Sequence, residues 1–212
     1  MKKTLLLLAS MALILMTSCD NKDNEPVLNE ENGHEYVDLG LSVKWATCNV
    51  GATKPEEFGS YFAWGETSTK ATYTKENYTY TEKPDILPLS ADAANANWGG
   101  AWRLPTQEEL DELLLKCTWT WCWNYNGNEG LFGYIVTSKI NGNAIFLPSA
   151  NVFYEQLSDS MEDYGAYMTS TFMGIDNYDR ALCCGLFFHE LAHDWGPFQV
   201  YSGLPVRPVI AK

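Results

Sequence analysis

One stretch near the C-terminus carries residue types at the spacing of a zinc protease. His189, Glu190 and His193 form the pattern HExxH. On a helix this pattern places both imidazoles on one face, where they bind zinc while the glutamate acts as general base. Such a site needs a third ligand, and Gln199 stands where the extended motif has histidine. The zinc site is therefore incomplete, and a zinc metalloprotease is kept as an alternative interpretation.

The residues around this motif favour a strand over a helix. Residues 181–188 alternate as in a strand, and Gly196-Pro197 follows soon after. In an extended chain, His189 and His193 lie about 13 Å apart, too far to share one metal ion without a bend. We therefore expect a polar hairpin tip at 189–194, with no metal site, no catalytic residue and no cofactor.

Cysteine is the other residue type that could react. Five cysteines follow Cys19, namely Cys48, Cys117, Cys122, Cys183 and Cys184. An exported chain meets an oxidising environment in which disulfides form. Because five is odd, at least one thiol stays free or pairs between chains. Cys183 and Cys184 are adjacent and would point to opposite faces of a strand, which disfavours a bond between them.

The N-terminus predicts export and lipid attachment. Two lysines precede an apolar run over 5–16, which is shorter than the roughly 20 residues of a membrane-spanning helix. The small residues before Cys19 resemble a lipobox, in which the thiol takes a diacylglyceryl group. We interpret 1–18 as a lipoprotein signal peptide, Cys19 as the lipidated residue and 19–32 as a flexible tether. An ordinary secretory signal with an incidental cysteine is the alternative.

The overall charge restricts the class of partner. The chain has 27 acidic and 14 basic residues and a formal net charge of −13. This balance argues against nucleic acid and against anionic membrane surfaces as partners. With 14% aromatic and 19% charged residues, the composition is that of a folded protein. We expect one domain over 33–212.

One helix is expected to help position these residues. Thr106 and Glu109 form a capping box ahead of leucines at helical spacing, which predicts a helix over about 106–116. Asn141-Gly142 between two apolar runs predicts a hairpin, and alternating runs on both sides of Gly40 predict another. Further strands are expected at 59–64, 166–172, 181–188 and 206–210.

Residues 66–97 show little periodicity and are rich in Thr, Asn, Lys and Tyr. A loop of this length is uncommon in a compact domain unless it has a function, so we expect a long surface excursion. Together the elements predict an α+β fold with short antiparallel strands, one clear helix and long loops.

Five blocks of sequence occur in a recognisable order. They are DLGLSVKWATCNVG at 38–51, WRLPT at 102–106, CTWTW at 117–121, NGNAIFLP at 141–148 and PVRPV at 205–209. Together they resemble the Fibrobacter succinogenes major paralogous (FISUMP) domain, found in surface lipoproteins of gut Bacteroidetes. The resemblance implies a C-type-lectin-like fold over about 33–212 and attachment to the outer membrane through a lipid anchor, with exposure at the cell surface.

The resemblance also implies a disulfide between Cys48 and Cys117, with two buried thiols as the alternative. The fold is akin to that of formylglycine-generating enzymes, but the copper-binding cysteine arrangement of those enzymes is not visible, because Cys183 and Cys184 are adjacent. Their oxidase activity is therefore not carried over. The triplets by which sugar-binding C-type lectins hold calcium are also missing from the sequence.

These observations favour a non-catalytic cell-surface module that binds an extracellular glycan or protein. Aromatic side chains in loop-like segments supply large contact areas at low entropy cost. The candidate ligand-binding residues are Trp119, Trp121, Trp123, Tyr125, Tyr178, Trp195 and Tyr201. Core packing of the same rings is one alternative, and a structural role in a surface or fimbrial assembly is another. Trp45, Trp64 and Trp102 are expected in the core.

Overall fold

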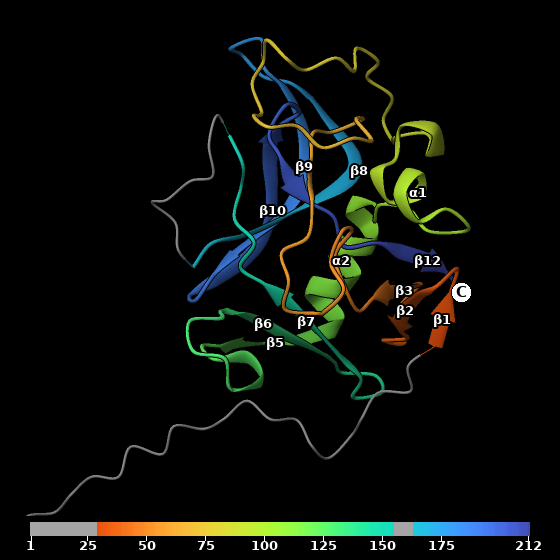
Figure 1. Ribbon diagram of the computed structural model, residues 1–212, viewed down its shortest axis with the longest axis vertical. Coiled ribbons are helices and arrows are strands. Elements are labelled where there is room, and N and C mark those ends of the chain that lie inside the picture. The colour runs from red at the N-terminus through yellow and green to blue at the C-terminus, as the bar shows by residue number, and fades with distance from the viewer. Residues whose placement is uncertain (1–28, 155–162) are drawn as a thin grey trace, which may run out of the picture.

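The computed structural model describes residues 29–154 and 163–212 (Figure 1). The expected signal peptide, Cys19 and most of the expected tether lie outside these residues. No helix within the described ranges is both long enough and apolar enough to cross a membrane. The elements in chain order are β1 (Asn29–Glu31), β2 (His34–Val37), β3 (Val43–Ala46), β4 (Tyr61–Phe62), α1 (Ala93–Trp98), α2 (Gln107–Lys116), β5 (Cys117–Cys122), β6 (Gly133–Ser138), β7 (Ala144–Pro148), β8 (Gly165–Ile175), β9 (Ala181–His189), β10 (Ala192–Gln199), β11 (Leu204–Pro205) and β12 (Val209–Ala211).

The described strands form small antiparallel sheets around α2. Their orders are β1-β2-β3-β12, β10-β9-β8, β5-β6-β7 and β11-β4. In Figure 1 the β8–β10 sheet occupies the upper half of the molecule, and the β5–β7 sheet lies at the bottom, with α2 between them. The antiparallel strands and few helices agree with the expected α+β class.

Several expected elements are confirmed. Helix α2 begins at Gln107, and its capping box is formed: the Thr106 hydroxyl accepts from the Glu109 N–H at 3.3 Å, and the Glu109 carboxylate accepts from the Thr106 N–H at 2.9 Å. The Asn141-Gly142 hairpin joins β6 to β7, with Gly142 at φ +79°. The other hairpin pairs β2 with β3 across Gly40.

Other expectations are corrected. The tether is shorter than predicted, because β1 begins at Asn29 and pairs with β2 through an Asn32-Gly33 turn, with both turn residues at positive φ. The 66–97 excursion ends in a second α-helix, α1. The carboxylate of Asp92 starts this helix by accepting from the Ala94 N–H at 2.8 Å.

The disulfide between Cys48 and Cys117 is also corrected, because both residues are free thiols. Cys48 follows β3, and its sulfur lies 3.6 Å from the Thr47 hydroxyl. Cys117 lies at the junction of α2 and β5 and packs in an apolar cluster that includes Leu113 and Val136. Burial raises the pKa of Cys117 to about 11 and also raises that of Cys48. Both groups are therefore held as thiols, the form that is slow in disulfide exchange.

A buried arginine holds the C-terminal segment against the end of β3. Arg207 is only 1% exposed. Its Nε donates to the Asn49 side-chain oxygen at 2.7 Å, and its Nη1 donates to the carbonyls of Thr47 at 2.7 Å and Ala46 at 3.1 Å. Within the described residues no carboxylate forms an ion pair with it. Burial lowers the pKa of Arg207, but an arginine remains protonated in proteins.

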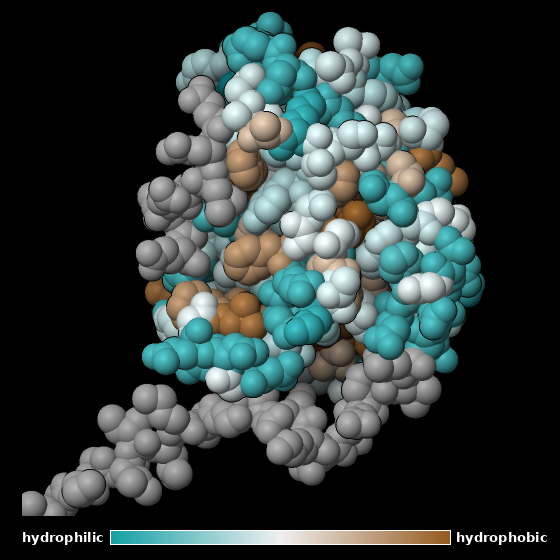
Figure 2. Space-filling view, in the orientation of Figure 1, coloured by the Kyte–Doolittle hydropathy of each residue, from teal (hydrophilic) through white to brown (hydrophobic). Residues whose placement is uncertain are grey.

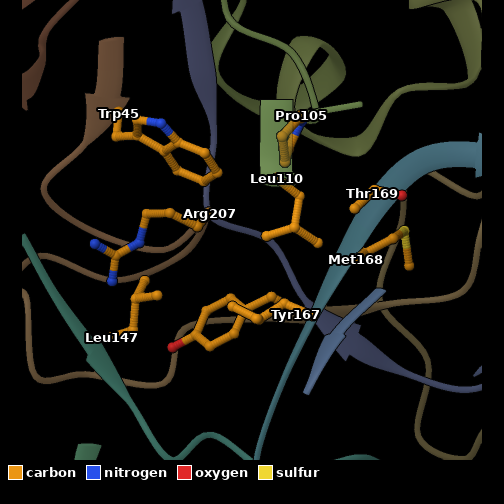
Figure 3. Close-up of a pocket in the computed structure, with 9 residues that line it drawn as sticks. Trp45, Pro105, Leu110, Leu147, Tyr167, Met168, Thr169 and Arg207 are labelled. Carbon is orange, nitrogen blue, oxygen red and sulfur yellow. The ribbon is translucent and has the colours of Figure 1, made fainter. Parts of the chain in front are cut away.

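The aliphatic part of this side chain belongs to the core. Figure 3 shows it lying between Trp45 and Leu147, with the Tyr167 hydroxyl directed toward the same side as the guanidinium. Together with Leu110 and other neighbours these residues enclose a cavity of about 10 Å³, which has room for about one water molecule at most. This interior space is therefore a packing defect and not a ligand site.

Replacing Arg207 with Met should destabilise the fold strongly. The substitution leaves two buried carbonyls and Asn49 without their donor, and we expect a loss of about 3–5 kcal/mol in the free energy of unfolding. Urea denaturation measures this loss. The control is Lys116→Met, which removes a partly exposed ion pair with Glu112 and should cost about 0.5 kcal/mol or less. Equal effects of the two substitutions would contradict the role assigned to Arg207.

Candidate functional site

The HExxH pattern lies on a β-hairpin, as its neighbours predicted. His189 is the last residue of β9, Glu190 and Leu191 form the turn, and His193 pairs with Phe188 across the hairpin. The predicted strand over 181–188 is thus confirmed. The whole of 189–194 is not a tip, however, because β10 already begins at Ala192.

The two imidazoles have different surroundings. The His193 ring stacks on Trp119 at 4.7 Å between centroids, with an interplanar angle of 9°. The Nδ1 of His189 instead accepts from the Leu191 N–H at 3.3 Å. Over 29–154 and 163–212, no group of three or more His, Cys, Asp or Glu side chains is arranged to hold a metal ion.

Three of the candidate aromatic residues are packed against neighbouring rings. Trp119 and Trp121 lie on β5, with their ring centroids 5.4 and 5.0 Å from that of Tyr134. Tyr125 stacks on Phe146 at 3.7 Å. The expectation of loop-like segments is therefore wrong for Trp119 and Trp121, because pairing with β6 makes 117–122 a strand.

The other four candidates divide between two regions. Trp195, on β10, is half-buried against the same apolar cluster as Trp119. Trp123 follows β5, is 46% exposed and packs edge-on against Phe132. Tyr178 and Tyr201 lie elsewhere: Tyr201 lines a cavity large enough for a ligand, and Tyr178 directly precedes Asp179, which lines the same cavity.

This tyrosine cavity has a volume of about 300 Å³. Its lining includes the rings of Tyr78, Tyr80 and Tyr201, the cations Lys75, Lys83 and Arg180, and the carboxylate of Asp179. It forms at the top of the molecule in Figure 1, where the yellow 66–83 segment meets the blue turn between β8 and β9. Tyr178 belongs to this turn and is 80% exposed beside the cavity.

The turn between β8 and β9 is fixed by one carboxylate. Asp176 Oδ1 accepts from the backbone N–H groups of Tyr178 at 2.9 Å and Arg180 at 3.0 Å. Its Oδ2 accepts from the Arg180 side chain at 2.7 Å. The Arg180 guanidinium in turn lies 5.1 Å from the centroid of the Tyr178 ring. These contacts hold the wall of the cavity that carries Asp179 and Arg180.

The 66–83 segment is also fixed, although it contains no strand or helix. Glu66 is buried and accepts from both the backbone N–H and the hydroxyl of Thr79 at 2.7 Å. The Tyr78 hydroxyl donates to the Trp64 carbonyl at 2.8 Å, and Tyr80 packs edge-on against the Trp64 ring at 5.8 Å. The tyrosine walls are therefore preformed, which reduces the ordering cost of binding.

Lys83 brings a positive charge to this cavity. Its Nζ donates to the carbonyls of Tyr80 at 3.2 Å and Glu82 at 3.1 Å. It also lies 5.4 Å from the centroid of the Tyr78 ring and 5.8 Å from that of Tyr80. Partial burial lowers the pKa of Lys83.

A second cavity, of about 320 Å³, borders the first, because Tyr80 lines both. Four hydroxyl side chains line this hydroxyl cavity, those of Thr67, Ser68, Thr69 and Thr79. Figure 2 shows mainly hydrophilic residues at this end of the molecule.

Of the residues that line this cavity, Tyr201 was a candidate from the sequence, whereas Tyr78, Tyr80 and Lys83 were not. The available signal was the long excursion itself, whose tyrosines and lysines have no periodicity that would assign them to a core.

The hairpin geometry makes a prediction about metal content. Because residues 185–195 form a hairpin, His189→Ala should leave the zinc content of the purified protein unchanged. Elemental analysis after dialysis measures it, with His34→Ala as the control substitution. One zinc per chain that disappears in His189→Ala alone would contradict this geometry.

Burial also makes the ionisation of His193 a test of its packing. Desolvation lowers the pKa of His193, although Asp194 acts in the opposite direction. We expect an NMR titration midpoint below the usual value of about 6.5, moving toward that value in Trp119→Leu but not in Trp119→Phe. Because folding favours the neutral ring, its contribution to stability is complete above about pH 6.5 and is lost as the pH falls through the folded-state pKa. A midpoint at or above the usual value would contradict the packing.

Comparison with protein-family models, with curated proteins and with solved structures finds no match to this chain. Of the two cavities of about 300 Å³ described above, the tyrosine cavity has the more aromatic lining, with three tyrosine rings.

Proposed function

We propose that this chain is a FISUMP-type lipoprotein of the outer membrane, anchored through Cys19 and exposed at the cell surface. In this proposal its C-type-lectin-like domain binds a glycan without catalysis. The observation that carries the proposal is the preformed tyrosine cavity of about 300 Å³. That volume is at the lower end of the range typical of small-ligand sites.

The lining suits a sugar. A tyrosine ring offers a broad amphipathic face at low entropy cost, and the ring of Tyr201 can pack against the carbon–hydrogen face of a pyranose. Asp179 and Thr81 line the same cavity, and their side-chain oxygens can bond to sugar hydroxyls. Apolar faces with a few convergent polar groups are the combination that orients a small ligand.

The neighbouring hydroxyl cavity supports a ligand longer than one sugar residue. Its threonines and serine can donate and accept hydrogen bonds, and Tyr80 separates it from the tyrosine cavity. Two adjacent hollows with a shared aromatic wall fit successive residues of an oligosaccharide. A protein partner more often uses a broad interface of about 800 Å² on each side, so the hollow shape favours a glycan.

Tyr201→Ala tests this proposal. The ring lines the cavity but is only partly buried, so its removal should weaken glycan binding about tenfold without unfolding the domain. The full chain carrying Cys19→Ser is first screened on a glycan array, and the dissociation constant for the best ligand is then measured by calorimetry for both forms.

Trp123→Ala is the matched control, because Trp123 is exposed but does not line the tyrosine cavity. It should leave the dissociation constant unchanged. Absence of binding to any glycan, or equal losses in the two variants, would overturn the proposed function.

A further inference from the structure

We infer that the tyrosine cavity selects a glycan carrying an oxyanion, a carboxylate or a sulfate, and that Lys83 is the residue that recognises it. This inference rests on the proposed function and names the ligand class of the same site.

The charge distribution sets this cavity apart from the rest of the chain. Acidic residues outnumber basic ones by 27 to 14 over the whole sequence. Among the residues that line this cavity the balance is reversed, with the three cations Lys75, Lys83 and Arg180 and the one carboxylate of Asp179, while Asp176 and Glu82 lie outside the lining. An anionic ligand approaching this acidic protein is repelled by most of its surface, so the local reversal favours this cavity.

The three cations are not equivalent. The charge of Arg180 is already compensated, because its guanidinium forms an ion pair with Asp176 at 2.6 Å. Within the part of the chain that the structure describes, neither Lys75 nor Lys83 forms an ion pair with a carboxylate. Lys75 is exposed, whereas Lys83 is partly withdrawn from water between two tyrosine rings.

Lys83 has a hydrogen bond left to give. An ammonium carries three N–H donors, and two of them are used by the carbonyls of Tyr80 and Glu82. The two rings hold the cation by cation–π attraction, which fixes it without neutralising it. An oxyanion in the cavity would accept a hydrogen bond from the third N–H and supply a negative charge to pair with the ammonium.

The acidic groups nearby limit how much negative charge the site accepts. Asp179 lines the cavity, and Glu82 accepts from the Tyr80 hydroxyl at 3.4 Å. Both carboxylates disfavour a second anion, while Asp179 can accept from a sugar hydroxyl. The arrangement therefore fits a sugar residue with one anionic group and free hydroxyls, and the charge-assisted bond to that group is about twice as strong as a neutral one.

The test compares matched pairs of ligands with the full chain carrying Cys19→Ser. Oligogalacturonate is compared with its methyl ester, which removes the carboxylate charges and leaves the sugar backbone unchanged. Dextran sulfate is compared with dextran, which examines sulfate in the same way. We expect at least one charged probe to bind about tenfold or more tightly than its neutral partner, and the pair that shows the difference identifies the oxyanion.

Lys83→Gln should abolish that preference, because it removes the charge and keeps the length of the side chain. Lys83→Arg should retain it, and Lys139→Gln, a substitution of an exposed lysine in the β6–β7 turn, should leave it unchanged. Circular dichroism and the melting temperature establish that each variant is folded.

The outcomes distinguish failure of the inference about Lys83 from failure of the proposed glycan binding. Binding of neutral and charged probes with equal affinity would overturn the inference and leave the proposed function standing. A charge preference that survives Lys83→Gln would also overturn it, because the preference would then arise elsewhere on the surface. If neither these probes nor any glycan on the array binds, the proposed function fails together with the inference.

Discussion

The burial of the Arg207 guanidinium is the constraint on which the domain depends. A charge without a carboxylate partner is costly inside a protein, and here the Nε and Nη1 of Arg207 donate to three acceptors near the end of β3. Backbone hydrogen bonds extend this contact. The Val50 N–H donates to the Val206 carbonyl, and the Ala46 N–H donates to the Pro208 carbonyl. Strand β12 thus lies in one sheet with β1, β2 and β3, which come from the other end of the described chain.

Elements whose ends are set by hydrogen bonds or turns between neighbouring residues could be predicted from the sequence. The capping box predicted α2, and Asn141-Gly142 predicted the β6–β7 hairpin. Strand β10 was missed because Gly196 and Pro197 lie inside it, and these residues usually end a strand. It forms because its register with β9 is set by tertiary pairing, and as an edge strand it tolerates a proline.

The candidate site was predicted only in part, for a similar reason. Tyr178 and Tyr201 stood out as aromatic residues beside turns, and 66–97 stood out as a long excursion. That these segments meet depends on contacts between residues about a hundred positions apart. No periodicity encodes such a contact. Trp119 and Trp121 on β5 were wrongly expected in loop-like segments. Their spacing could not reveal that Tyr134 and Phe188 would pack against them.

The position of β1 has a consequence for how the protein would stand on a cell. In Figure 1 this strand lies in the lower half of the molecule, whereas the 66–83 segment lies at the top. An anchor at Cys19 would be joined to Asn29 by a chain that can extend no more than about 35 Å. A bilayer would then lie nearer to β1 than to the 66–83 segment, so the residues of that segment that line the tyrosine cavity would stand away from the lipid headgroups.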